Sequence, residues 1–173
     1  MKAVRRLVTN EVRIKIRFLI SGKMSEELPD ACESGDVGTV HACLARGEDV
    51  NARNCIDKTP LMTAVWNNQL EILRILLVRD DLDIAVTDGV GWLTALHYAC
   101  MYGRADCVPL LGTDRRMTSD IINMKNIYGD TALMMAVKFG HSSCVKRMEE
   151  LDGVYLQTHN MGVTLGRHDP LTH

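Results

Sequence analysis

TPLMTAV at residues 59–65 returns twice in altered form, as TALHYAC at 94–100 and TALMMAV at 131–137. A shortened copy, GVTLG, follows at 162–166. The threonines of the four phrases lie 35, 37 and 33 residues apart along the chain. Self-similarity at a nearly constant period of this length is typical of a protein built from stacked copies of one small unit.

Each copy of the phrase predicts a short helix, a tight turn and a second helix. Nine residues after the opening threonine stands a residue that tolerates left-handed backbone, namely Asn68, Gly103 or Gly140. An earlier copy, which lacks the threonine, has Gly35 at this turn. After the turn an apolar-periodic run resumes, as in QLEILRILLV from residue 69. Helices of roughly eight to ten residues are marginal alone in water, so the copies are expected to stack.

These phrases resemble ankyrin repeats, whose pattern joins a Gly-x-Thr-Pro-Leu-His opening, paired small residues, a turn glycine and a closing Gly-Ala-Asp-Val-Asn-Ala. The phrases that match best are GEDVNAR at 47–53, DKTPL at 57–61, TALHYAC and GDTAL at 129–133. The likeness runs from about residue 26 to about residue 165. It implies an all-α repeat solenoid, an ankyrin-repeat stack of helix-turn-helix units with short β-hairpin or loop tips.

The domain organisation follows from the register of the repeats. We expect a flexible basic extension at 1–23, a repeat domain at 24–165 and a tail at 166–173. Within the repeat domain the units are expected at about 24–53, 54–87, 88–125 and 126–160, followed by a truncated fifth. The chain is therefore expected to be either a short array or part of a longer one.

Four local features depart from the repeat pattern. Asp57 stands where the opening glycine is usual, and one extra residue lies between Gly91 and Thr94, so both tips are expected to be distorted. Pro109 lacks a backbone N–H, so the second helix of the third unit is expected to be short. The segment TDRRMTSD at 113–120 is expected to form a longer loop.

Composition and charge narrow the classes of function. The net charge is −2, yet residues 1–23 hold seven basic residues and one acid, so the rest of the chain is acidic and binding to nucleic acid is not expected there. No apolar run is long enough to predict a transmembrane helix. Six cysteines without a clear signal peptide predict reduced thiols and an intracellular location, cytoplasmic or nuclear.

The basic segment 1–23 leaves several interpretations open. It is either a flexible extension ahead of a start at Met24, a basic arm that binds nucleic acid or an anionic membrane, or a mitochondrial presequence. The last interpretation lacks the expected serines.

His97 and Cys100, three residues apart, raise the alternative of a metal or thiol site. Zinc needs four ligands, usually from two short spacings, and no second pair lies near these two. The resemblance implies instead that His97 hydrogen-bonds the opening threonine and neighbouring backbone. Five cysteines align with apolar positions of other repeats and are expected in the core: Cys32, Cys43, Cys100, Cys107 and Cys144. Cys55, in a predicted tip, is expected to be exposed.

No phosphate-binding loop, dinucleotide fingerprint or catalytic constellation occurs in the sequence, so we expect neither an enzyme nor a bound cofactor or metal. The resemblance implies a non-catalytic adaptor or scaffold that binds another protein through the concave face and the tips. Five of the eight aromatic residues fall on the variable positions of that face, although packing between repeats is an alternative role for them. The expected partner-binding residues are Ile56, Lys58, Trp66, Asn67, Trp92, Met101, Tyr102, Ile127, Tyr128, Asp130, Lys138 and Phe139, with Cys55 and Val90 beside them. We expect the chain to be a monomer or part of a longer chain.

Overall fold

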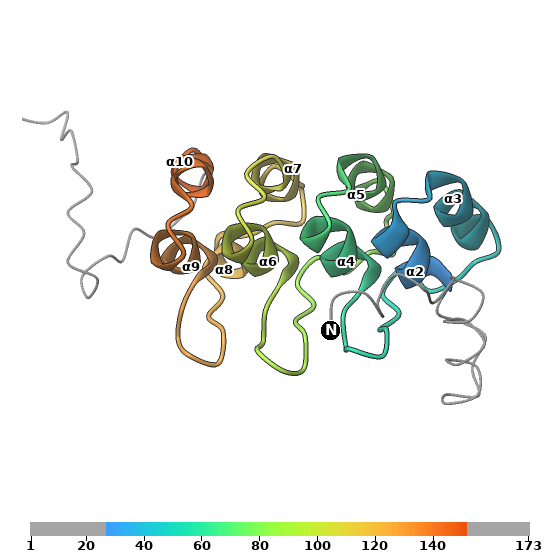
Figure 1. The fold of residues 1–173 in the computed structure, drawn as a ribbon, viewed down its shortest axis with the longest axis horizontal. Helices are drawn as coiled ribbons and strands as arrows, with labels where there is room; N and C mark the ends of the chain where they lie inside the picture. The colour runs from blue at the N-terminus through green and yellow to red at the C-terminus, as the bar shows by residue number, and fades with distance from the viewer. Residues whose placement is uncertain (1–26, 152–173) are drawn as a thin grey trace, which may run out of the picture. The chain divides into compact units, whose positions relative to one another are not determined.

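A computed structural model describes residues 27–151, and all regular elements in this range are helices (Figure 1). The predictions for the basic segment 1–23, the truncated fifth repeat and the tail 166–173 lie outside the described residues. The chain divides into two compact units, Met1–Asp83 and Ile84–His173, called unit 1 and unit 2 below. No helix within residues 27–151 has the length and apolar character needed to cross a membrane.

Unit 1 contains two helix pairs. The first pair is α2 (Glu27–Ser34) and α3 (Val37–Ala45), and the second is α4 (Pro60–Trp66) and α5 (Leu70–Leu77). The first helices α2 and α4 pack side by side, as do the second helices α3 and α5. Their buried faces form the core of the unit, which includes Leu28, Cys32, Val40, Cys43, Leu61, Val65, Ile72 and Leu76.

Unit 2 repeats this arrangement with one addition. The helix pairs are α6 (Ala95–Met101) with α7 (Cys107–Gly112), and α9 (Ala132–Lys138) with α10 (Ser142–Glu149). Between the pairs lies the four-residue helix α8 (Ser119–Ile122). Helix α6 packs against α9, and α7 packs against α10. The cysteines predicted to be core residues, Cys100, Cys107 and Cys144, are buried there.

The opening threonine of the repeated phrase sets where each first helix begins. Thr59, Thr94 and Thr131 are the N-cap residues of α4, α6 and α9, with extended backbone. Each side-chain oxygen accepts a hydrogen bond from the backbone N–H three residues later, at 3.3–3.4 Å. This bond satisfies one of the free N–H groups at the start of a helix. The threonine therefore acts locally, and its repetition fixes the register of the helices.

The turn after each first helix has the left-handed backbone that the sequence predicted. The φ angles are +80° at Gly35, +58° at Asn68, +69° at Gly103 and +73° at Gly140. The residue after each turn donates its backbone N–H to the carbonyl five residues earlier, at 2.8–3.0 Å. This bond closes the helix end and directs the chain into the second helix.

The third repeat deviates as its sequence indicated, with one correction. Helix α7 is only six residues long, which confirms the prediction from Pro109. Pro109 is the third residue of α7, where its missing N–H breaks no intrahelical bond. The segment 113–120 is not all loop, because its last two residues begin α8. Thr118 caps that helix by accepting from the N–H of Ile121 at 3.4 Å, and Ile122 anchors it in the core.

Candidate functional site

Each described tip between helix pairs is organised by a buried Asn or Asp side chain. Asn54, Asp88 and Asn126 hold this position. The Oδ1 atom of each accepts two backbone N–H groups of the same tip, at 2.9–3.1 Å. These bonds hold each tip in a tight loop. Residues 27–151 contain no β-strand, so the tips are loops rather than β-hairpins. This role is not predicted from the repeated phrase, although all three residues precede the opening threonine by five or six positions.

Two residues before the opening threonine, the backbone of each tip is left-handed. Asp57 has a φ of +61°, Trp92 of +54° and Gly129 of +81°. The extra residue in the third repeat therefore places Trp92, rather than Gly91, at the position where glycine is favoured. A left-handed conformation costs a residue with a Cβ about 1–2 kcal/mol. Trp92 is thus held in a strained backbone while its side chain is 58% exposed.

The two tips of unit 2 are neighbours and carry exposed apolar side chains. The backbone N–H of Ile127 donates to the carbonyl of Gly91 at 3.1 Å, which ties one tip to the other. In Figure 1 both tips extend on the side of the unit opposite to α7 and α10. Their exposed large apolar residues are Val90, Trp92, Ile127 and Tyr128, of which Tyr128 is the most exposed at 79%.

The ends of the first helices add two aromatic side chains to unit 2. Tyr102 and Phe139 occupy equivalent positions, the C-caps of α6 and α9, and both are exposed. The Tyr102 ring stacks on the buried Tyr98 ring, with centroids 6.1 Å apart. Tyr98 in turn donates its hydroxyl hydrogen to Oδ2 of Asp88 at 2.6 Å. Part of Tyr102 is therefore used for packing, whereas Phe139 makes no such ring stack with any residue between 27 and 151.

In unit 1 the predicted surface residues divide into two groups. Ile56 and Asn67 are exposed, and Cys55 is exposed as predicted. Lys58 contradicts its expected exposure, because it is only 8% exposed and its Nζ lies 3.2 Å from the centroid of the Trp66 ring. This cation–π contact covers one face of Trp66, which is half-buried. Lys58 and Trp66 thus stabilise each other rather than project together into solvent.

The remaining predicted positions in unit 2 are partly covered. Met101 and Asp130 are half-buried, and Lys138 is exposed. Lys138 Nζ forms an ion pair with Oδ2 of Asp130 at 3.1 Å. One exposed residue was not anticipated: Val78, the C-cap of α5, is 80% exposed. It is the last residue of the apolar run 69–78 and lies just beyond the end of the helix.

His97 and Cys100 are both buried in the core of unit 2. His97 is fully buried, and its Nδ1 lies 2.8 Å from Oγ1 of Thr94 and 3.3 Å from the backbone N of the same residue. Its Nε2 lies 3.3 Å from the carbonyl oxygen of Asp130, which can only accept, so Nε2 carries the hydrogen. His97 therefore ties its own tip to the next one, as the resemblance implied. Burial raises the pKa of the Cys100 thiol well above its usual range, so the thiolate needed for catalysis or metal binding is disfavoured.

The burial of His97 predicts a pH dependence of stability. Burial lowers the pKa of His97 below its ordinary value of 6.5, so the unfolded chain binds this proton at a higher pH than the folded chain does. The contribution of His97 is therefore complete above pH 6.5 and is lost as the pH falls, by at most about 1.4 kcal/mol per pH unit. Urea unfolding between pH 7.5 and 5 should show a slope that the His97→Gln variant lacks. Equal slopes in both proteins would contradict this role.

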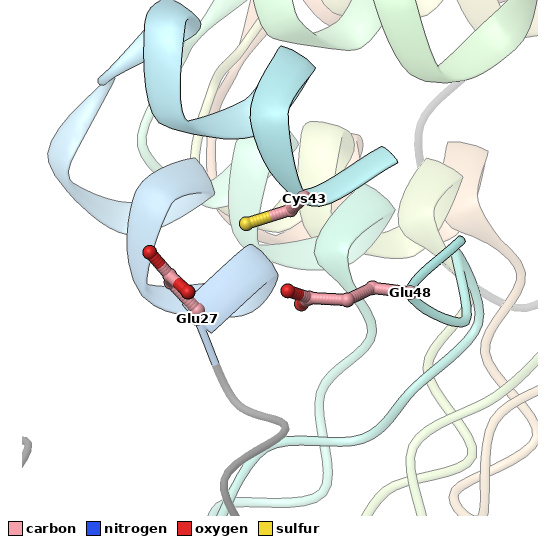
Figure 2. A group of neighbouring side chains, drawn as sticks. All are labelled: Glu27, Cys43 and Glu48. Atoms are coloured by element: carbon pink, nitrogen blue, oxygen red, sulfur yellow. The ribbon is translucent and has the colours of Figure 1, made fainter. Parts of the chain in front are cut away.

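Glu27, Cys43 and Glu48 converge at the start of unit 1, in an arrangement that could suggest a metal site (Figure 2). A cation is already present there, because Nη2 of Arg46 lies 2.6 Å from Glu27, 2.7 Å from Glu48 and 3.2 Å from the sulfur of Cys43. Burial raises the pKa of the Cys43 thiol to about 11. Oε2 of Glu48 also accepts from the backbone N–H of Leu28 at 3.3 Å. The cluster joins the start of α2 to the segment after α3 and is structural.

Comparison with known proteins agrees with this architecture. Family models described as ankyrin repeats match residues 28–77 and 83–158. A probable E3 ubiquitin-protein ligase, XBOS33, from Oryza sativa subsp. japonica is 33% identical over 98 residues, which cover 57% of this chain and 19% of that protein. The E3 ubiquitin-protein ligase XBAT33 from Arabidopsis thaliana is 27% identical over 159 residues, covering 79% of this chain and 31% of the relative.

A third relative is a toxin rather than a ligase. Alpha-latrotoxin-Lg1a from Latrodectus geometricus is 29% identical over 145 residues, covering 82% of this chain and 10% of the toxin. The chain thus spans a third or less of the length of each of these relatives. What the relatives share with this chain is the repeat and not one activity. Two adjacent matches that together span most of residues 28–158, on a fold of paired helices with capped turns, establish that the chain belongs to the ankyrin-repeat family.

Proposed function

We propose that the chain is a protein-recognition module, an adaptor or scaffold without chemistry of its own. Ankyrin repeats in general mediate protein–protein interaction and are non-catalytic. One observation carries the proposal: in unit 2, large apolar side chains gather on the tips and first-helix ends and remain exposed. We name this set the recognition surface, and it consists of Val90, Trp92, Tyr102, Ile127, Tyr128 and Phe139.

The recognition surface has the composition that protein interfaces favour. Tryptophan and tyrosine bury a large area on binding and lose little side-chain entropy, because they have few rotatable bonds. They are enriched among the residues that dominate binding energy. Other large side chains fill the cores of the helix pairs, such as Leu96, Leu111, Leu133 and Met148, and in the described part of the chain only Tyr102 among the aromatic residues of the surface stacks on a buried ring. Trp92 gives the strongest support, since a glycine there would relieve the strain of a positive φ.

The surface is rigid enough to present these side chains in a fixed geometry. The carboxylate of Asp88 holds the first tip and the amide of Asn126 holds the second. The hydrogen bond between Ile127 and Gly91 joins the two tips. His97 adds a further bond from α6 to the second tip. A preorganised surface loses less conformational entropy when a partner binds.

The proposal predicts that exposed aromatic residues matter for binding and not for folding. The triple variant Trp92→Ala/Tyr128→Ala/Phe139→Ala should lose partner capture by about tenfold or more, because truncating dominant interface residues each costs about 2 kcal/mol or more. Capture from the source cells is quantified by mass spectrometry with the full chain as bait, and the partner is then titrated in purified form.

The matched control removes exposed apolar area elsewhere. Val78→Ala truncates a side chain of unit 1 that is 80% exposed, and it should leave partner capture unchanged. If the triple variant and the control retain the same proteins as the wild type, the recognition surface is not where partners bind.

A further inference from the structure

The tips of the repeats differ in how they neutralise their own charge. In the tip of unit 1, Nη1 of Arg53 forms an ion pair with Oδ2 of Asp57 at 2.8 Å. Arg53 directly precedes the tip-organising Asn54, and Asp57 is the left-handed residue. This pair places the guanidinium of Arg53 in an internal bond, and the other cation of the tip, Lys58, is buried against Trp66.

The second tip of unit 2 keeps the basic residue but lacks the acid. Lys125 directly precedes Asn126, at the position of Arg53, and Gly129 stands at the position of Asp57. Lys125 is exposed, and within residues 27–151 no carboxylate pairs with it. The nearest acids in sequence are Asp120 and Asp130, five residues away on either side, and Asp130 is already paired with Lys138.

The first tip of unit 2 supplies no compensating charge either. Thr87 and Trp92 occupy the positions of Arg53 and Asp57, so an apolar ring stands where unit 1 has an acid. Asp88 is buried and accepts from the backbone N–H groups of Gly91 and Leu93 and from the Tyr98 hydroxyl. The second tip therefore carries an exposed basic residue, Lys125, two and three positions before the exposed apolar residues Ile127 and Tyr128.

Resting on the function proposed above, we propose that these joined tips bind a peptide segment in which apolar side chains flank an aspartate or glutamate. The apolar side chains contact Trp92 and Tyr128, and the carboxylate pairs with Lys125. Charge complementarity selects this class of partner, because an uncompensated ammonium at an apolar surface favours a segment that brings the missing acid. Trp92 is the anchor of the site, held in place by a backbone conformation that a more common glycine would relax.

The test begins with a displayed library of random twelve-residue peptides selected against the full chain. Enriched peptides should combine aromatic or aliphatic residues with at least one Asp or Glu. The synthetic form of the most enriched peptide is then titrated against three proteins: the wild type, Lys125→Glu and Trp92→Gly. We expect each variant to bind roughly tenfold or more weakly. Trp92→Gly should melt at the same temperature as the wild type or higher, which shows that its loss of affinity does not come from unfolding.

A charge exchange makes the assignment specific to Lys125. Replacing the acid of the peptide by lysine should weaken binding to the wild type and restore binding to Lys125→Glu. Peptides that depend on Trp92 but carry no acid, or that ignore Lys125→Glu, would overturn this inference and leave the proposed recognition function standing. Enriched peptides indifferent to both substitutions would contradict both. A concentration-dependent dimer that Trp92→Gly dissociates in sedimentation would identify a second copy as the occupant and would likewise overturn the inference.

Discussion

The His97→Ala variant is expected to unfold with a free energy about 2–4 kcal/mol lower than the wild type, as measured by urea denaturation at pH 7.5. Removal of a fully buried side chain leaves a cavity, and large-to-small substitutions in a core cost about 2–5 kcal/mol. The change also leaves the carbonyl of Asp130 and the N–H of Thr94 without their imidazole partner. A single substitution thus loosens two tips and the start of α6.

The matched control for His97→Ala is Met134→Ala. Met134 occupies the same position of the next repeat, three residues after its opening threonine, and is half-buried. Truncating Met134 removes packing contacts but no hydrogen bond between tips. We therefore expect the free energy of unfolding to fall by only about 1 kcal/mol. An equal loss in both variants would show that His97 acts only by filling space.

The Gly103→Ala variant is expected to lose about 2–3 kcal/mol of unfolding free energy. The φ of Gly103 is +69°, which costs alanine about 1–2 kcal/mol. A Cβ at this position would lie 2.8 Å from Nδ1 of His141, so the imidazole would have to shift. That shift would weaken or break the hydrogen bond between Nε2 of His141 and the carbonyl oxygen of Met101, which lie 3.1 Å apart. Loss of such a hydrogen bond contributes about 1 kcal/mol more.

Gly140→Ala separates the two causes. Gly140 has nearly the same φ, +73°, but a Cβ there would meet no atom within 4 Å. Only the cost of placing alanine in a left-handed backbone remains. We therefore expect the free energy of unfolding to fall by about 1–2 kcal/mol. If Gly140→Ala were as destabilising as Gly103→Ala in parallel urea titrations, the packing of His141 over the turn would contribute nothing.

The repeat architecture could be predicted from the sequence because its determinants are local and recur. Thr94 caps a helix through a bond to a residue three positions away, and Gly103 adopts a conformation that few residues tolerate. Neither needs a distant partner to act. The same holds for the short α7, since the restriction on Pro109 is covalent. The helix α8 was missed because its four residues carry little periodic signal, although Thr118 is the same kind of cap.

The candidate surface was less predictable, because exposure depends on contacts between residues that the repeat pattern does not pair. Lys58 was expected in solvent, yet its long apolar stem can be buried while its ammonium meets the ring of Trp66. Because of the extra residue before Thr94, the sequence did not show that Trp92 takes the place of the usual glycine. The positive φ of Trp92 in the structure shows this directly. The stacking of Tyr102 on Tyr98 likewise depends on side-chain geometry.

Whether the exposed aromatic residues serve recognition rather than folding is decided by one paired measurement on the Trp92→Ala/Tyr128→Ala/Phe139→Ala variant. Its affinity for the captured partner and its free energy of unfolding are determined under the same conditions. We predict an affinity about tenfold or more below that of the wild type, with unfolding free energy within about 1 kcal/mol. An unchanged affinity, or a loss of stability above about 3 kcal/mol, would show that these side chains are not a binding surface.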